Sequence, residues 1–179
     1  MNAETLRSKY AAGQRDFRQA NLYREKLTFV CLDGAKFSRA NLGRINLRGA
    51  NLRGVDLREA DLIRANLKDA DLTGANLEGA NLAWANLSGA NLTGANLKQV
   101  NLNRAVLGGA NLSQTNLRHA NLCEAILFGA ILTGAILLKA NLAGAVLLKT
   151  NLTNASVIDT DLSEARLEEV TMPDGTIQK

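Results

Sequence analysis

The chain has 179 residues, of which 46% are hydrophobic, 21% charged and 4% aromatic, and its formal net charge is +4. This composition excludes an intrinsically disordered chain and suits one domain that can bury a core. No apolar run approaches the length of about 18 residues that a membrane-spanning helix needs, so no membrane span is expected.

Charge is distributed unevenly along the sequence. Residues 1–68 hold 14 Lys and Arg against 7 Asp and Glu, whereas residues 69–179 hold 7 against 10. We therefore expect a basic N-terminal end, able to attract anionic partners, and a mildly acidic C-terminal end. The alternative is a solvated surface of mixed charges with no role in binding.

Residues 2–12 are expected to form a helix. Asn2 is a favoured N-terminal capping residue, and Leu6 and Tyr10 fall on one face four residues apart. We expect this face to cover the segment that follows, and we assign residues 1–14 to a capping helix. They lack an apolar stretch of the length that a signal peptide needs, so a cytoplasmic location is expected.

From Phe17 to Met172 the sequence repeats with a period of five. All 32 positions spaced five apart are apolar, and 28 of them are Leu. The position two before is Ala in 22 repeats, and the position directly before is Asn or Asp in 21. On an α-helix this period would scatter Leu over every face, and on a flat strand it would alternate faces. Only a chain that turns a corner every five residues keeps each Leu in one core, which predicts a polygonal all-β solenoid over residues 15–172.

The positions of glycine indicate four sides. Glycines in the second position after Leu cluster at intervals of 20 residues, where corners need a permissive backbone. One such column contains Gly34, Gly54, Gly74, Gly94 and Gly134. Four repeats per coil predict about eight coils. Arg15 and Glu25 occupy positions usually held by Ala, so local distortion is expected in the first coils.

Residues 173–179 are expected to form a turn and a tail. Pro173, Asp174 and Gly175 are typical turn residues, and Thr176 and Ile177 are expected to fold back on the last coil.

The Ala-Asn/Asp-Leu-x-x pattern, as in Ala75-Asn76-Leu77-Glu78-Gly79, resembles the repeats of the pentapeptide repeat family. The resemblance implies a right-handed quadrilateral β-helix. The helix before the coils and the Met-Pro-Asp-Gly tail resemble small stand-alone cyanobacterial members. Some members of the family mimic DNA and act on DNA gyrase through an acidic, dimeric rod. The net positive charge of this chain and the short segment after its repeats disfavour that role.

Large apolar residues replace polar ones at outward positions of the later coils. On one side these are Val106, Ile126, Phe128, Val146 and Leu148. On the opposite side they are Ile136, Leu138 and Ile158. Exposed apolar columns indicate a surface for a partner protein, including a second copy of the chain. The alternative is lateral stacking that only reinforces the solenoid.

A basic column is the second candidate surface. It contains Arg24, Arg44, Arg64 and Arg104, with Trp84 in the gap. Such a column is a candidate site for an anionic polymer or surface, with nucleic acid the less favoured partner. Acidic residues are interspersed with it and would weaken it, namely Glu25, Asp56, Glu59 and Asp61.

The sequence offers little catalytic chemistry. The only histidine is His119, and the two cysteines, Cys31 and Cys123, lie far apart in outward positions. These residues predict neither a catalytic triad nor a structural zinc site, and no cofactor is implied. We therefore expect a non-enzymatic rigid scaffold or protein-interaction module.

Overall fold

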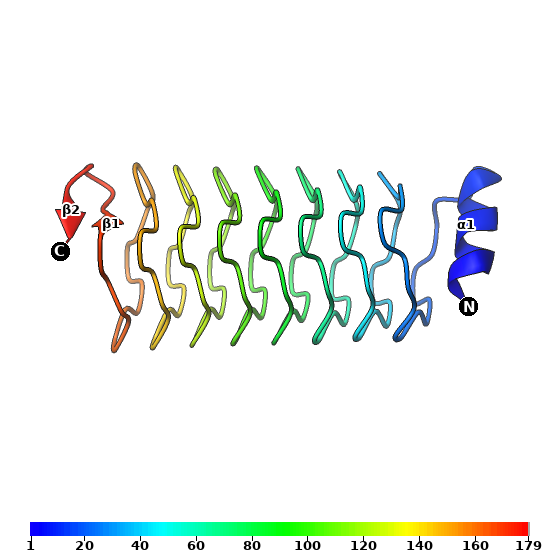
Figure 1. Cartoon of the computed structure of the whole chain (residues 1–179), viewed down its shortest axis with the longest axis horizontal. Helices are drawn as coiled ribbons and strands as arrows, with labels where there is room; N and C mark the ends of the chain where they lie inside the picture. The colour runs from blue at the N-terminus through cyan, green and yellow to red at the C-terminus, as the bar shows by residue number, and fades with distance from the viewer. Residues whose placement is uncertain (179) are drawn as a thin grey trace.

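The computed structural model describes residues 1–178, which wind into a rod with a helix at one end and two short strands at the other (Figure 1). Helix α1 spans Ala3–Ala11, strand β1 spans Val170–Thr171 and strand β2 spans Ile177–Gln178. The coils stack between α1 and β1, so the two ends of the chain lie at opposite ends of the rod. Lys179, the last residue of the expected tail, lies outside the described residues.

Each five-residue repeat makes one bridge and one turn. In a representative repeat, Asn81 bridges to a neighbouring coil, Leu82 is buried, and the Ala85 N–H donates to the Leu82 carbonyl at 3.0 Å to close the turn. Trp84, the third residue of this turn, has a φ of 63°. The equivalent position in every repeat from Gln19 to Glu169 also has a positive φ, as type II turns require.

Parallel bridges join residues 20 positions apart, from Asp16 with Lys36 to Asn151 with Thr171. Four repeats therefore complete one coil, which confirms the four-sided architecture. Within residues 1–178 only β1 and β2 are continuous strands, because a corner every five residues leaves a single bridging residue on each side. The right-handed sense and the count of about eight coils stay predictions.

The core is a stack of Leu with Ala beside it. Leu82 and Ala85 are both fully buried, as are the equivalent residues of the neighbouring coils. At the N-terminal end the rings of Phe17 and Phe37 stack with centroids 5.4 Å apart. A gap of about 10 Å³ remains among the first Leu rows, at the lower limit of the space that one water molecule needs. Within residues 1–178, side chains therefore fill this part of the interior almost completely.

Helix α1 covers the N-terminal end of the solenoid, as the sequence predicts. The Asn2 side chain accepts a hydrogen bond from the Thr5 N–H at 2.8 Å, and Leu6 is fully buried against the core. Leu6 therefore shields the apolar end of the first coil from water. The Tyr10 hydroxyl donates to the Asp33 carbonyl at 3.0 Å and fastens the end of the helix to the coils.

The prediction that the first coils are locally distorted is wrong. Bridges and turns alternate without interruption from Asp16 onward. Glu25 is accommodated because it lies near the open end, where its carboxylate accepts the Ala3 N–H at 3.0 Å. Arg15 lies at the end of the solenoid, where its guanidinium stacks 3.8 Å from the centroid of the Tyr10 ring. Both unusual residues attach the helix to the coils.

The C-terminal segment folds back on the last coil. The Gly175 N–H donates to the Met172 carbonyl at 2.9 Å, and the Met172 N–H donates to the Thr176 carbonyl at 2.7 Å. This turn brings β2 antiparallel to β1. The turn and the return of the chain agree with the pattern of residues 173–177.

Candidate interaction surfaces

The repeat decides which side chains reach the surface. Asn81 and Ala83, directly before and after Leu82, are partly exposed on the same side of the rod, and Trp84 projects at the next corner. Because coils repeat every 20 residues, outward residues 20 positions apart form columns along the rod, about 4.8 Å from one coil to the next. Every candidate surface of this protein is therefore a set of columns.

We call the set Val106, Ile126, Phe128, Val146 and Leu148 the apolar face. Phe128 is 51% exposed and Ile126 is 41% exposed, while the other three are half-buried. Val106, Ile126 and Val146 follow one another in a single column of bridges. Stacking within the column therefore covers only part of these side chains, and a continuous apolar strip remains in contact with water.

The apolar face lacks a hydrogen bond that most repeats make. At most Asn and Asp positions the side-chain oxygen accepts the N–H two residues on, as from Arg48 to Asn46 at 3.2 Å. Val106, Ile126 and Val146 have no such oxygen. Within residues 1–178, the N–H groups two residues after them, at positions 108, 128 and 148, make no hydrogen bond. Each such bond is typically worth about 0.5–1.5 kcal/mol, so the apolar face forgoes a stabilising interaction in three successive coils.

The second apolar column lies on the opposite side of the coils, ten residues along the chain. Ile158 is 64% exposed, and Ile136 and Leu138 are half-buried. Ser156, not an apolar residue, bridges to Ile136 in the next coil. The second column is therefore shorter and less continuous than the apolar face.

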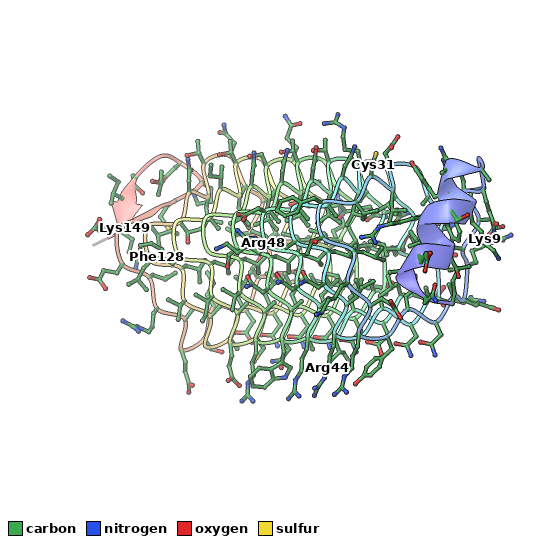
Figure 2. All side chains as sticks on the ribbon, turned by 45° about the vertical axis from the view of Figure 1, so that its right-hand side comes forward. Lys9, Cys31, Arg44, Arg48, Phe128 and Lys149 are labelled. Carbon is green, nitrogen blue, oxygen red and sulfur yellow. The ribbon has the colours of Figure 1, made fainter. Side chains whose placement is uncertain are left out.

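The Arg column runs along one corner of the rod, where Arg44 points away from the coils (Figure 2). The Trp84 ring lies between two of its members, with its centroid 6.0 Å from the guanidinium of Arg64 and 4.8 Å from that of Arg104. Arg104 also pairs with Glu124 at 2.7 Å. Arg24, Arg44 and Arg64 form no ion pair within residues 1–178.

The acidic residues that were expected to weaken this column are engaged elsewhere. Glu59 pairs with Arg39 at 2.9 Å, and Asp56 pairs with Arg58 at 2.8 Å. Glu25 accepts the hydrogen bond from α1, and Asp61 accepts the Ile63 N–H at 2.9 Å. None of these four carboxylates pairs with the Arg column in the described part of the chain.

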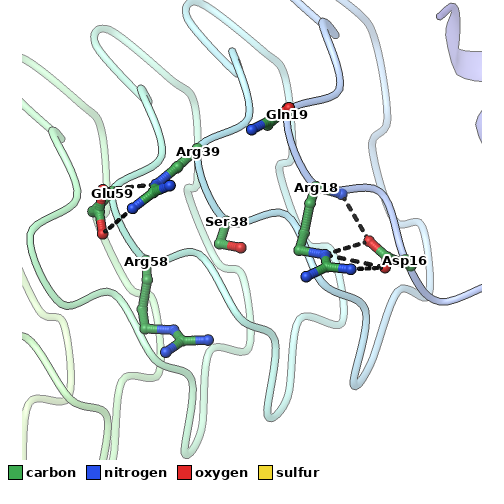
Figure 3. Close-up of a pocket in the computed structure, with 7 residues that line it drawn as sticks. All are labelled: Asp16, Arg18, Gln19, Ser38, Arg39, Arg58 and Glu59. Atoms are coloured by element: carbon green, nitrogen blue, oxygen red, sulfur yellow. Dashed lines mark hydrogen bonds and ion pairs between the residues drawn. The ribbon is translucent and has the colours of Figure 1, made fainter.

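An open hollow of about 510 Å³ lies near α1 and was not predicted from the sequence (Figure 3). Arg18 and Arg58 stand on either side of Ser38, and Arg39 and Glu59 border the next corner. The signal in the sequence is an Asp followed two residues later by Arg, in the pairs Asp16–Arg18 and Asp56–Arg58.

The charges of the hollow are internally neutralised. Hydrogen bonds from Arg18 lower the pKa of the Asp16 carboxyl to about 2, and Arg39 likewise lowers the pKa of the Glu59 carboxyl. An anion would have to displace a carboxylate from each guanidinium that it bound. The hollow is therefore polar without a free charge to attract a ligand.

The side chains that could act in catalysis or bind a metal lie far apart from one another. His119 and Cys31 are exposed, and Cys123 is half-buried and unpaired. Within residues 1–178 no three His, Cys, Asp or Glu side chains gather where they could hold a metal ion. No helix of this described part is both long and apolar enough to cross a membrane.

The family can be assigned from sequence comparison. The profile of the family described as pentapeptide repeats matches in eight copies, over residues 31–69, 40–79, 65–104, 80–118, 105–137 and 137–169. The chain belongs to the pentapeptide repeat family. No curated protein matches it in sequence.

Solved pentapeptide repeat proteins share its sequence pattern. HetL from the cyanobacterium Nostoc sp. strain PCC 7120, described as involved in heterocyst differentiation regulation, is 36% identical over 99% of this chain and 100% of its own, with a TM-score of 0.41. The protein alr5209 from Nostoc PCC 7120 is 49% identical over 56% of this chain and 80% of its own, with a TM-score of 0.53.

A more distant likeness is to QnrB1, a plasmid-mediated fluoroquinolone resistance protein. It is 20% identical over 83% of this chain and 90% of its own, with a TM-score of 0.46. At this level of identity and overlap the likeness supports no functional conclusion for this pentapeptide repeat protein.

Proposed function

We propose that this pentapeptide repeat protein is a non-enzymatic rigid scaffold that binds another protein through its apolar face. The observation that carries the proposal is the loss of three side-chain acceptors in successive coils, where Val106, Ile126 and Val146 replace Asn or Asp. Ile126 and Phe128, which lies two residues after it, are both more than 40% exposed. Stacking alone would not need Phe128, whose ring lies in the other outward column. Burial of these groups by a partner would recover the free energy that their exposure costs.

The matched faces of the rod allow a controlled test. The double variant Phe128→Ser and Leu148→Ser should lose the bound partner in affinity capture from cells that make the protein. The double variant Leu138→Ser and Ile158→Ser, on the opposite side, should retain it. Equal retention by both variants would reject the apolar face, and selective loss with the second would transfer the role to the other column.

The Arg column is a second candidate site, for an anionic polymer. It is favoured by three guanidinium groups in successive coils that form no ion pair within residues 1–178, Arg24, Arg44 and Arg64. Binding of a polyanion such as heparin should weaken as the salt concentration rises, because counterions compete for the same charges. The variant Arg24→Gln with Arg44→Gln should reduce both the affinity and its dependence on salt. Binding that ignores salt would reject this function.

The proposal does not include an action on DNA gyrase. DNA mimicry needs an acidic surface, whereas this chain has a net charge of +4 and its basic half carries three of the four Arg residues of the Arg column. Inhibition of supercoiling at micromolar protein would contradict this view. A cytoplasmic location is part of the proposal and stays a prediction.

A further inference from the structure

The centre of the apolar face and the corner beside it have a pattern that complements itself when the rod is reversed end to end. We propose that two copies of the chain form an antiparallel, side-by-side dimer through this face, with the two-fold axis between the coils of Val106 and Ile126. The inference rests on the proposed function, because it names a second copy of the chain as the partner of the same surface. Figure 2 shows Phe128 on one side of the rod together with Arg48, which lies nearer to α1.

Because the coils are regular, the two-fold axis fixes which residues of the two copies face each other. A two-fold axis in the plane of the interface and across the rod reverses the order of the coils, while each column still faces the same column of the second copy. Val106 then lies opposite Ile126 of the second copy, and Ile126 lies opposite Val106. The two central apolar coils therefore meet each other, whereas Val146 and Leu148 lie opposite Asn86 and Ser88 of the second copy.

The same operation places large exposed side chains over glycines. Phe128, 51% exposed, lies opposite Gly108 of the second copy. Only the Phe128 backbone oxygen of its own chain comes within 4 Å of a Cβ placed on Gly108, at 3.7 Å, so the surface there is open. In the adjacent corner column Trp84, 48% exposed, lies opposite Gly144. The Phe128 ring therefore faces an open surface, whereas the Trp84 ring faces a glycine beside the Glu124 side chain, whose Cγ lies 3.5 Å from a Cβ placed on Gly144.

Opposite charges also meet in this arrangement. Lys68 lies opposite Glu168 of the second copy, and Arg64 lies opposite Glu164. All four side chains are exposed, and none forms an ion pair within residues 1–178. By symmetry each pair occurs twice in the dimer. The uneven charge along the sequence, +7 for residues 1–68 and −3 for the rest, thereby becomes complementary.

The corner column selects this register over its neighbours. In the proposed register Arg104 lies opposite Glu124 of the second copy, and it also pairs with Glu124 of its own chain at 2.7 Å. The two Arg104 and the two Glu124 side chains therefore alternate in sign. The next register in one direction places Glu124 opposite Glu124, and the next in the other places Arg104 opposite Arg104. Like charges in direct opposition would disfavour both.

A parallel arrangement is disfavoured because it places the two basic halves side by side. The antiparallel dimer has one unfavourable pair, Asp69 opposite Glu169. Each of these carboxylates already has a cation in its own chain, Arg48 at 3.7 Å and Lys149 at 3.6 Å. Arg24 and Arg44 lie beyond the dimer interface and stay open to solvent.

Charge reversal with sedimentation equilibrium tests the register. The wild-type chain should show a mass that rises toward twice the monomer mass at micromolar concentration. Lys68→Glu and Glu168→Lys should each raise the dissociation constant by about tenfold, and the double variant should restore it. Lys139→Glu, an exposed reversal outside the face, should leave the dissociation constant unchanged. Circular dichroism should confirm that all four variants keep the wild-type fold.

A wild-type chain that stays monomeric at all concentrations would overturn the inference. So would a dimer in which both single reversals have no effect, or one in which the double variant is not restored. Phe128→Ser separates this result from the proposed function. If it releases a captured partner protein while the wild-type chain is monomeric, the dimer is rejected and the proposed function stands. If it affects neither capture nor dimerisation, both are rejected.

Discussion

Replacement of Gly94 by Ala tests how the left-handed corners contribute to stability. Gly94 is the third residue of its turn and has a φ of 67°. A Cβ at this position would meet no atom within 4 Å, so the substitution changes the backbone energy without any clash. In addition, the Gly94 N–H, which donates to the Ser113 carbonyl at 2.9 Å, is retained.

The expected magnitude follows from two opposing effects. A residue with a Cβ in the left-handed region costs about 1–2 kcal/mol relative to glycine. The unfolded chain becomes less flexible on replacement of Gly by Ala, which offsets about 0.4–1 kcal/mol. Gly94→Ala should therefore lower the free energy of unfolding by about 0.8 kcal/mol, the difference between the midpoints of these two ranges.

Urea denaturation followed by circular dichroism measures this change as a lower midpoint at an unchanged slope. Ala83→Gly is the matched control, because Ala83 is the second residue of its turn and has no positive φ. In this control only the flexibility of the unfolded chain changes. Ala83→Gly makes the unfolded chain more flexible and should lower the free energy of unfolding by about 0.4–1 kcal/mol. A Gly94→Ala variant as stable as the wild type, or more stable, would refute the reasoning.

Three further predictions concern the core, the cap and the response to acid. Leu97→Ala, in a fully buried row at mid-rod, should cost about 2–5 kcal/mol in urea denaturation, and Leu162→Ala, half-buried near the end, should cost less. Glu25→Ala removes the acceptor of the first N–H of α1 and should lower helical circular dichroism and the free energy of unfolding by about 0.5–2 kcal/mol; a neutral effect would show that the cap is dispensable. The pKa of Asp16 is lowered from 3.8 to about 2 by hydrogen bonds from Arg18, so this pair favours the folded state above pH 3.8 and loses its effect as the pH falls from 3.8 to about 2. Asp16→Asn should therefore make stability less dependent on pH in that interval, and an identical profile would contradict the assignment.

The central repeat was predictable because a five-residue period admits one packing solution. Leu82 and Ala85 face inward in the structure as their spacing requires, and the stacking of residues 20 apart agrees with the column of Gly34 to Gly134. The exposed positions of Phe128 and Ile126 follow from the same rule. Each of these features depends on the repeat alone, without knowledge of distant contacts.

Other features depended on where the rod ends. Glu25 reads as a defect in a periodic sequence, and its role as an acceptor for α1 is set by the position of the helix over the first coil. The charge pairs of the surface were a second feature that the sequence left open. Asp56 pairs with Arg58 and Glu59 pairs with Arg39, so these two carboxylates do not neutralise the Arg column as had been expected. Long charged side chains choose among several neighbours, and their choice depends on the arrangement in space of the whole surface.

By itself, then, the sequence determined the coil, its four sides and the inward Leu rows of this protein, because the period leaves the backbone no alternative. Only the tertiary structure decided which charged side chains pair with one another and which remain unpaired beside the apolar face. These are properties of atoms brought together from different coils, and a five-residue pattern does not contain them.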